Sequence, residues 1–99
     1  MEEEIHLYIN NSELDLLIEN LKEKLIINNN EINILFIETN YVQIIIKNIK
    51  LFDDICNFMD EYIIKSPELR YQINLFTKNK EYPYRIHINK QNKKIITKN

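Results

Sequence analysis

Few side chains in this sequence have both the type and the spacing that catalysis requires. The only serines, Ser12 and Ser66, occur where helices are expected to begin and end, and helix capping or termination explains both. His6 and His87 fall at polar positions of expected strands, and we assign them no carboxylate or cysteine partner nearby in the sequence. Cys56 lies in a helical apolar stripe, where a cysteine is usually a small buried hydrophobe. We therefore predict a protein that is not an enzyme and that carries no cofactor.

Metal binding is the next chemistry to consider. Two acidic pairs, Asp53-Asp54 and Asp60-Glu61, supply carboxylates, but both lie on the polar face of an amphipathic helix, where acids are simply solvated. A zinc site is not expected from one cysteine and two widely separated histidines. We therefore predict no metal site. The same four acids form part of an acidic surface that would steer the protein towards a basic target, or would only keep it soluble.

The charge of the chain is distributed unevenly. Residues 1–62 contain thirteen acidic and four basic residues, whereas residues 63–99 contain two acidic and nine basic ones. The basic half mixes cations with aromatic residues, a combination that suits phosphates and stacked bases; its candidate nucleic-acid contacts are Lys78, Lys80, Arg85, Lys93 and Lys94. A solvated face is the favoured interpretation, because the net charge is −2 and the aromatic signature of RNA-recognition domains is missing.

The composition excludes several functions and suggests a source. The chain has no glycine, so the glycine-dependent Walker, dinucleotide-binding and nucleophile-elbow loops are absent in standard form. One cysteine, no apolar run of membrane-spanning length and an acidic amino terminus predict a cytoplasmic protein, in a bacterium or an infected host cell. Ile, Asn and Lys are abundant, which we attribute to an AT-rich genome.

Hydrophobic periodicity predicts six strands and two helices in one domain spanning residues 1–99. The strands are expected at 5–10, at 31–38 and 41–47 in a hairpin turning at Thr39-Asn40, at 69–75, at 84–89 and around 95–96; the helices are expected from Ser12 to about Ile27 and from Asn48 to about Lys65. The order β-α-β-β-α-β with a C-terminal hairpin extension matches the ferredoxin-like split βαβ pattern, an α+β fold. Both helices would then cover one face of an antiparallel sheet in which the usual strand order is fourth, first, third, second. The extra strands would extend the sheet beyond the fourth strand or fold over its open face.

The hairpin of residues 31–47 is apolar on both faces, which is unusual for a one-sided sheet. Leu35, Ile37 and Ile45 form its second apolar face, and the strand at 31–38 is expected at the edge with charges only at its ends. Either the C-terminal hairpin covers this face, or a partner does. An unguarded edge suits self-association or strand addition on a target. We predict that the protein self-associates through this hairpin as a homodimer with a two-fold axis.

These observations together predict a small non-enzymatic protein-binding domain. The predicted contact residues are Leu35, Ile37, Ile45, Asp53, Asp54, Asp60 and Glu61. Small size, polarised charge and the inferred genome composition suggest an inhibitor or immunity-type (anti-defence) protein of a phage, virus or mobile element that acts by steric occlusion of its target. The alternative is a nucleic-acid-binding module that uses the basic C-terminal hairpin.

Overall fold

The computed structural model describes residues 3–10, 14–38, 40–87 and 93–95, and shows an α+β fold with an antiparallel sheet and two helices. In chain order the elements are β1 (Glu4–Asn10), α1 (Leu14–Leu25), the 3-10 helix η2 (Asn29–Glu31), β2 (Ile32–Glu38), β3 (Tyr41–Ile46), the 3-10 helix η3 (Ile49–Leu51), α2 (Phe52–Lys65), β4 (Tyr71–Thr77), β5 (Lys80–His87) and β6 (Lys93–Ile95). The strands form one sheet in the order β2-β3-β1-β4-β5-β6. The predicted α+β class is therefore confirmed.

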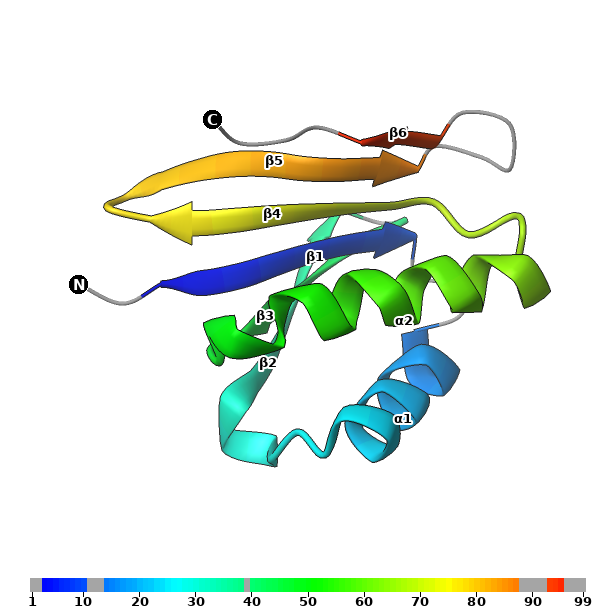
Figure 1. Ribbon diagram of the computed structural model, residues 1–99, viewed down its shortest axis with the longest axis horizontal. Helices are drawn as coiled ribbons and strands as arrows, with labels where there is room; N and C mark the ends of the chain where they lie inside the picture. Colours follow the sequence, from blue (N-terminus) through cyan, green and yellow to red (C-terminus); the bar gives the residue numbers. More distant parts are fainter. Residues whose placement is uncertain (1–2, 11–13, 39, 88–92, 96–99) are drawn as a thin grey trace.

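The C-terminal strands extend the sheet sideways. β5 pairs with β4, and β6 pairs with β5, both antiparallel. Of the two placements considered from the sequence, the described strands thus show the first: β5 and β6 extend the sheet beyond β4. β2 forms the opposite edge of the sheet (Figure 1). The complete sheet is longer than the four strands of the predicted split βαβ pattern.

Alternation along the central strands builds the hydrophobic core. On β1, the fully buried Ile5, Leu7 and Ile9 alternate with residues of the other face, because successive side chains of a strand point to opposite sides. β3 and β4 continue the same buried face with Val42, Ile44 and Ile46 and with Tyr71, Ile73 and Leu75. Each fully buried aliphatic side chain contributes about 1.5–3 kcal/mol relative to an exposed one.

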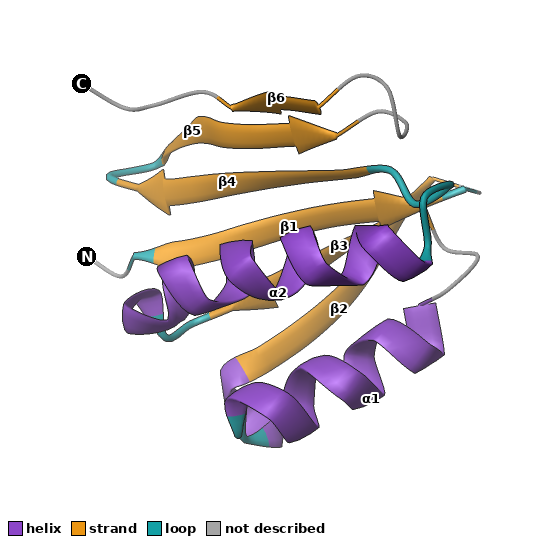
Figure 2. Ribbon diagram, turned by 45° about the vertical axis from the view of Figure 1, so that its right-hand side comes forward, coloured by secondary structure: helices purple, strands orange, loops and turns teal. Residues whose placement is uncertain are grey.

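Both helices pack against this apolar face, as Figures 1 and 2 show. α1 buries Leu17, Ile18 and Leu21, and α2 buries Ile55, Cys56, Phe58 and Met59. Asn48 caps the entry to the second helical segment, because its side chain accepts a hydrogen bond from the Lys50 backbone N–H at 3.1 Å. The expected cap at Ser12 lies outside the described residues. The other face of the sheet carries no described helix.

The ends of two predicted strands need correction. β4 begins at Tyr71 rather than Leu69, and β5 begins at Lys80 rather than Tyr84. Leu69 still belongs to the turn before β4, because its N–H donates to the Ser66 carbonyl oxygen at 3.0 Å. The early start of β5 is due to a two-residue turn at Lys78 and Asn79, whose φ values of 53° and 63° are those of a type I′ hairpin. This tight turn places Lys80 and Glu81 inside β5, whereas the sequence suggested that they belong to the turn. The Thr39 part of the β2–β3 turn lies outside the described residues.

Candidate functional site

β2 is the outer strand of the sheet, and its far side meets no other strand of the described chain. Three consecutive apolar side chains near its C-terminal end are exposed: Leu35 by 43%, Phe36 by 71% and Ile37 by 50%. Large apolar residues at an unprotected edge are a recognised template for pairing with another chain. We call this element, Ile32–Glu38 with its three exposed apolar side chains, the β2 edge.

The second apolar face of the hairpin is not covered by the C-terminal strands. Asn33 and Leu35 pair with Ile45 and Gln43 of β3, so these residues share the face that points away from the helices. β5 and β6 lie at the opposite end of the sheet from β2. The explanation that the C-terminal hairpin closes over the hairpin of residues 31–47 is therefore wrong for the described strands. Ile45 is half-buried, while Leu35 and Ile37 remain open to solvent.

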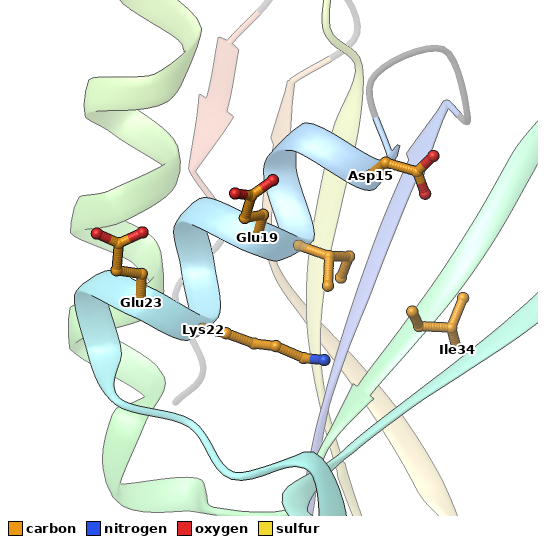
Figure 3. Close-up of a pocket in the computed structure, with 6 residues that line it drawn as sticks. Asp15, Glu19, Lys22, Glu23 and Ile34 are labelled. Atoms are coloured by element: carbon orange, nitrogen blue, oxygen red, sulfur yellow. The ribbon is translucent and has the colours of Figure 1, made fainter.

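A groove lies between α1 and the β2 edge. It has a volume of about 520 Å³, and its lining residues are Asp15, Ile18, Glu19, Lys22, Glu23 and Ile34. Figure 3 shows the three acids spaced along α1, with Glu19 and Glu23 projecting from a different side of the helix than Lys22, which extends towards the side of Ile34 on β2. Asp15, Glu19 and Glu23 are four residues apart, a spacing that places them on one side of the helix; we call them the acidic row. The groove thus combines negative charge with an apolar strand.

The open face of the sheet carries a cluster of polar side chains that the sequence did not reveal. His6 Nδ1 lies 2.5 Å from Glu81 Oε1, and the Tyr8 hydroxyl donates to both Glu81 oxygens at 2.7 and 2.9 Å. Asn74 donates to Glu81 Oε2 at 2.7 Å, and Gln43 donates to the Tyr8 hydroxyl at 3.0 Å. Residues of β1 and β4 therefore converge on the carboxylate of Glu81, at the start of β5, and Gln43 of β3 joins the cluster through Tyr8.

The expectation that His6 has no carboxylate partner nearby in the sequence is wrong. Its Nε2 lies 3.1 Å from Oε1 of Glu4, two residues earlier on the same face of β1. A strand period of two was the available signal for this contact. No sequence signal indicated Glu81, which is 75 residues away from His6.

The chemistry of this cluster is that of a satisfied polar network. Burial acts to raise the pKa of Glu81, but hydrogen bonds from Tyr8, Asn74 and His6 outweigh it and hold the pKa below its ordinary value. Burial, helped by the Glu81 carboxylate, raises the pKa of the Tyr8 hydroxyl, which therefore stays protonated as a donor. The His6 side chain is only 7% exposed and stacks on Phe76 with ring centroids 5.0 Å apart. A ring covered in this way is poorly placed to reach a substrate.

The acids of α2 are divided between solvent and internal ion pairs. Asp53 and Asp54 are exposed in the first turn. Asp60 accepts a hydrogen bond from Arg85 at 2.8 Å, and Glu61 accepts one from Lys24 of α1 at 2.6 Å. Two of the four predicted contact acids are thus paired within the chain, and their role in binding a target stays a prediction.

The five basic residues predicted to contact nucleic acid belong to β5, β6 and the turn before β5, at the opposite end of the strand order from the β2 edge. Lys78 and Lys80 are exposed around the β4–β5 turn. Arg85 points to α2, because it pairs with Ile73 of the buried face and donates to Asp60 and to the Cys56 carbonyl oxygen. Lys93 and Lys94 belong to β6, and their side chains lie outside the description. Among the basic residues whose side chains are described, Lys78 and Lys80 are exposed, whereas Arg85 is turned towards α2. These three residues therefore do not share one exposed surface.

A second hollow, of about 830 Å³, lies between the two helices. It is lined in part by Leu16, Lys24, Phe58 and Ile64. Leu16 and Ile64 are exposed, by 54% and 79%. Unlike the β2 edge, this surface is made of helices whose backbone groups are hydrogen-bonded internally, so any partner would be held by side chains alone. Ile64 therefore serves as a control position for the β2 edge.

No metal cluster is found where the structure is described: no three His, Cys, Asp or Glu side chains in those ranges are arranged to hold an ion. Burial raises the pKa of the Cys56 thiol, which disfavours the reactive thiolate. Among the described helices, none is both long and apolar enough to cross a membrane. No known protein family, characterised protein or solved structure gives a match to this chain.

Proposed function

We propose that this chain is a protein-binding domain that works without catalysis and whose contact surface is the β2 edge. The single observation that supports the proposal is the combination of an unpaired outer strand with the exposed side chains of Leu35, Phe36 and Ile37. An extended segment added to such an edge gains backbone hydrogen bonds, while pockets for alternate side chains select the partner. The polar cluster around Glu81 would support the sheet behind this surface.

The finer assignments made from the sequence belong to the same proposal. The strand order of β1 to β4 supports a ferredoxin-like core that is extended by β5 and β6. An inhibitor or immunity-type protein of a phage, virus or mobile element, acting in the cytoplasm by steric occlusion, is the role that suits a rigid sheet with one open edge. A second copy of the chain is one candidate partner, and a strand of another protein is the other.

The experiment is selection from a displayed library of random twelve-residue peptides on the immobilised protein. Peptides that bind at the β2 edge should lose binding to the Leu35→Lys/Ile37→Lys double variant, because lysine guards an edge against strand addition. They should retain binding to Ile64→Lys, which places the same charge on the helical surface. Peptides that bind all three proteins alike would contradict the proposal, and so would a selection that yields no binder.

A further inference from the structure

We propose that the β2 edge accepts an extended segment in which lysine or arginine alternates with apolar residues, and that the acidic row selects the basic positions. The inference rests on the proposed function of the β2 edge and names the chemistry of its partner. It draws on the open strand, the exposed apolar side chains and the carboxylates of the groove beside them.

The geometry of an added strand places its two sets of side chains in different surroundings. Such a strand would lie about 4.8 Å beyond β2, with successive side chains pointing to opposite faces. On the open face, one set would lie beside the exposed Leu35, which is directly paired with Gln43 across the hairpin. On the helix face, the other set would point towards the groove of the acidic row. Apolar residues suit the first set and cations suit the second.

The spacing of the acidic row fits the repeat of a strand. Four residues of an α-helix rise by about 6 Å, and two residues of a strand advance by about 6.7 Å. Asp15, Glu19 and Glu23 of α1 therefore recur at nearly the same interval as alternate side chains on an adjacent strand. α1 and β2 run in opposite chain directions, but their axes are similarly inclined in both ribbon views (Figures 1 and 2). The interval along α1 therefore matches the spacing of cations two residues apart on an added strand.

The chain itself does not neutralise the acidic row within the described ranges. Lys22 lies in the same groove, but its Nζ donates to Asn29 Oδ1 of η2 at 2.8 Å. Figure 3 shows this side chain extending away from the three carboxylates. The ion pairs of the described residues involve other acids, namely Glu4, Asp60, Glu61 and Glu81. The acidic row is therefore available to a partner.

Charge also decides against a second copy as the occupant. In an antiparallel pair of β2 strands related by a two-fold axis, both α1 helices would lie on the same face of the joined sheet. The two acidic rows would then flank one interface and repel each other, and like charges across an interface oppose association. The negative charge of the acidic row repels a second copy of the chain but attracts a basic segment from another protein.

The probes are two synthetic peptides, a seven-residue Lys-Val alternation and a seven-residue Thr-Val alternation, titrated into the ¹⁵N-labelled protein and followed by NMR. Both peptides should shift the amide signals of β2. The Lys-Val peptide should bind at least about tenfold more tightly than the Thr-Val peptide in dilute buffer, and the advantage should shrink at about 0.5 M salt. The Leu35→Lys/Ile37→Lys variant should bind neither peptide.

Two matched triple variants separate local charge from net charge, since each removes three negative charges. One neutralises the acidic row, with Asp15→Asn, Glu19→Gln and Glu23→Gln. The other neutralises exposed acids of α2, with Asp53→Asn, Asp54→Asn and Glu61→Gln. The first should cost the Lys-Val peptide about tenfold in affinity and leave the Thr-Val peptide unchanged. The second should change either affinity by less than about twofold.

The outcomes distinguish this inference from the function on which it rests. Equal affinities for the two peptides, or equal losses in the two triple variants, would overturn the basic partner while leaving the β2 edge as a binding surface. Peptides that still bind the Leu35→Lys/Ile37→Lys variant would overturn the proposed function itself. A stable homodimer that excludes both peptides would identify a second copy as the occupant and overturn the inference.

Discussion

Replacing Ile26 by glycine should stabilise the protein, although it removes a large apolar side chain. Ile26 follows the last residue of α1 with φ at 54°, in the left-handed region. The helix ends there with the Ile27 N–H donating to the Lys22 carbonyl oxygen at 3.1 Å. Helices commonly end with such a left-handed residue, and glycine is the usual choice. A chain without glycine places a β-branched residue at this position instead.

The size of the effect follows from three contributions. The left-handed conformation costs a non-glycine residue about 1–2 kcal/mol. The substitution also costs about 0.4–1 kcal/mol of stability, because glycine has more conformational freedom in the unfolded chain. Little burial is lost, since Ile26 is 83% exposed. We expect a net gain of about 0.5–1 kcal/mol in the free energy of unfolding, or roughly 2–8 °C in Tm for a domain of this size.

The assay is thermal unfolding followed by circular dichroism, with urea unfolding as a second measure of stability. Ile64→Gly is the matched control, because Ile64 is similarly exposed, at 79%, but lies within the last turns of α2. Glycine inside a helix should lower the free energy of unfolding there by about 0.5 kcal/mol. The reasoning is refuted if Ile26→Gly lowers Tm by as much as Ile64→Gly does.

Three further predictions concern charge. The pKa of Glu81 is lowered in the folded protein, so its carboxylate stabilises the fold at neutral pH and this contribution disappears as the pH falls through that lowered pKa. Glu81→Gln should therefore lower Tm at pH 7, and its Tm should converge with that of the wild type once the pH lies below the lowered pKa. Arg85→Met should cost about 1–3 kcal/mol in urea unfolding, because it leaves the half-buried Asp60 carboxylate without its cation; a loss no larger than that from breaking the exposed α1–α2 ion pair would contradict this. Binding to nucleic acid, measured by fluorescence anisotropy, should be weak and strongly salt-dependent, and Lys78→Glu/Lys80→Glu should reduce it for all sequences alike; tight, sequence-selective binding at high salt would instead favour the nucleic-acid function.

The sequence by itself determined the elements and much of the candidate surface. Helical stripes and strand alternation are local patterns, so they indicated both helices and the succession of strands along the chain without any knowledge of distant contacts. The double apolar character of the 31–47 hairpin likewise pointed to Leu35 and Ile37, which are exposed in the structure. The sequence placed Glu19 and Glu23 in an acidic surface on the first helix, whereas Asp15 was interpreted as part of the helix cap. Their position opposite Ile34 required the packing of α1 against the sheet.

The tertiary structure decided which way several polar side chains point. Simple alternation placed Arg85 on the polar side of its strand, but the register shifts between Ile73 and Asn74 in the pairing of β4 with β5. A bulge of this kind inserts one residue and reverses the faces that follow it. Arg85 is therefore opposite Ile73 and reaches Asp60 of α2. Periodicity within one strand cannot reveal a shift that depends on the neighbouring strand.

The tertiary structure alone also brought the members of the polar cluster together. His6 and Glu81 are separated by most of the chain, and they meet because β1 and β5 both flank β4 in the sheet. Considered alone on its strand, His6 suggested a side chain of the polar face without a nearby partner, whereas in the fold it is buried between two carboxylates. Burying such polar groups is favourable only when every donor and acceptor finds a partner. Those partners come from four strands, and only the folded sheet fixes how the strands are ordered and aligned.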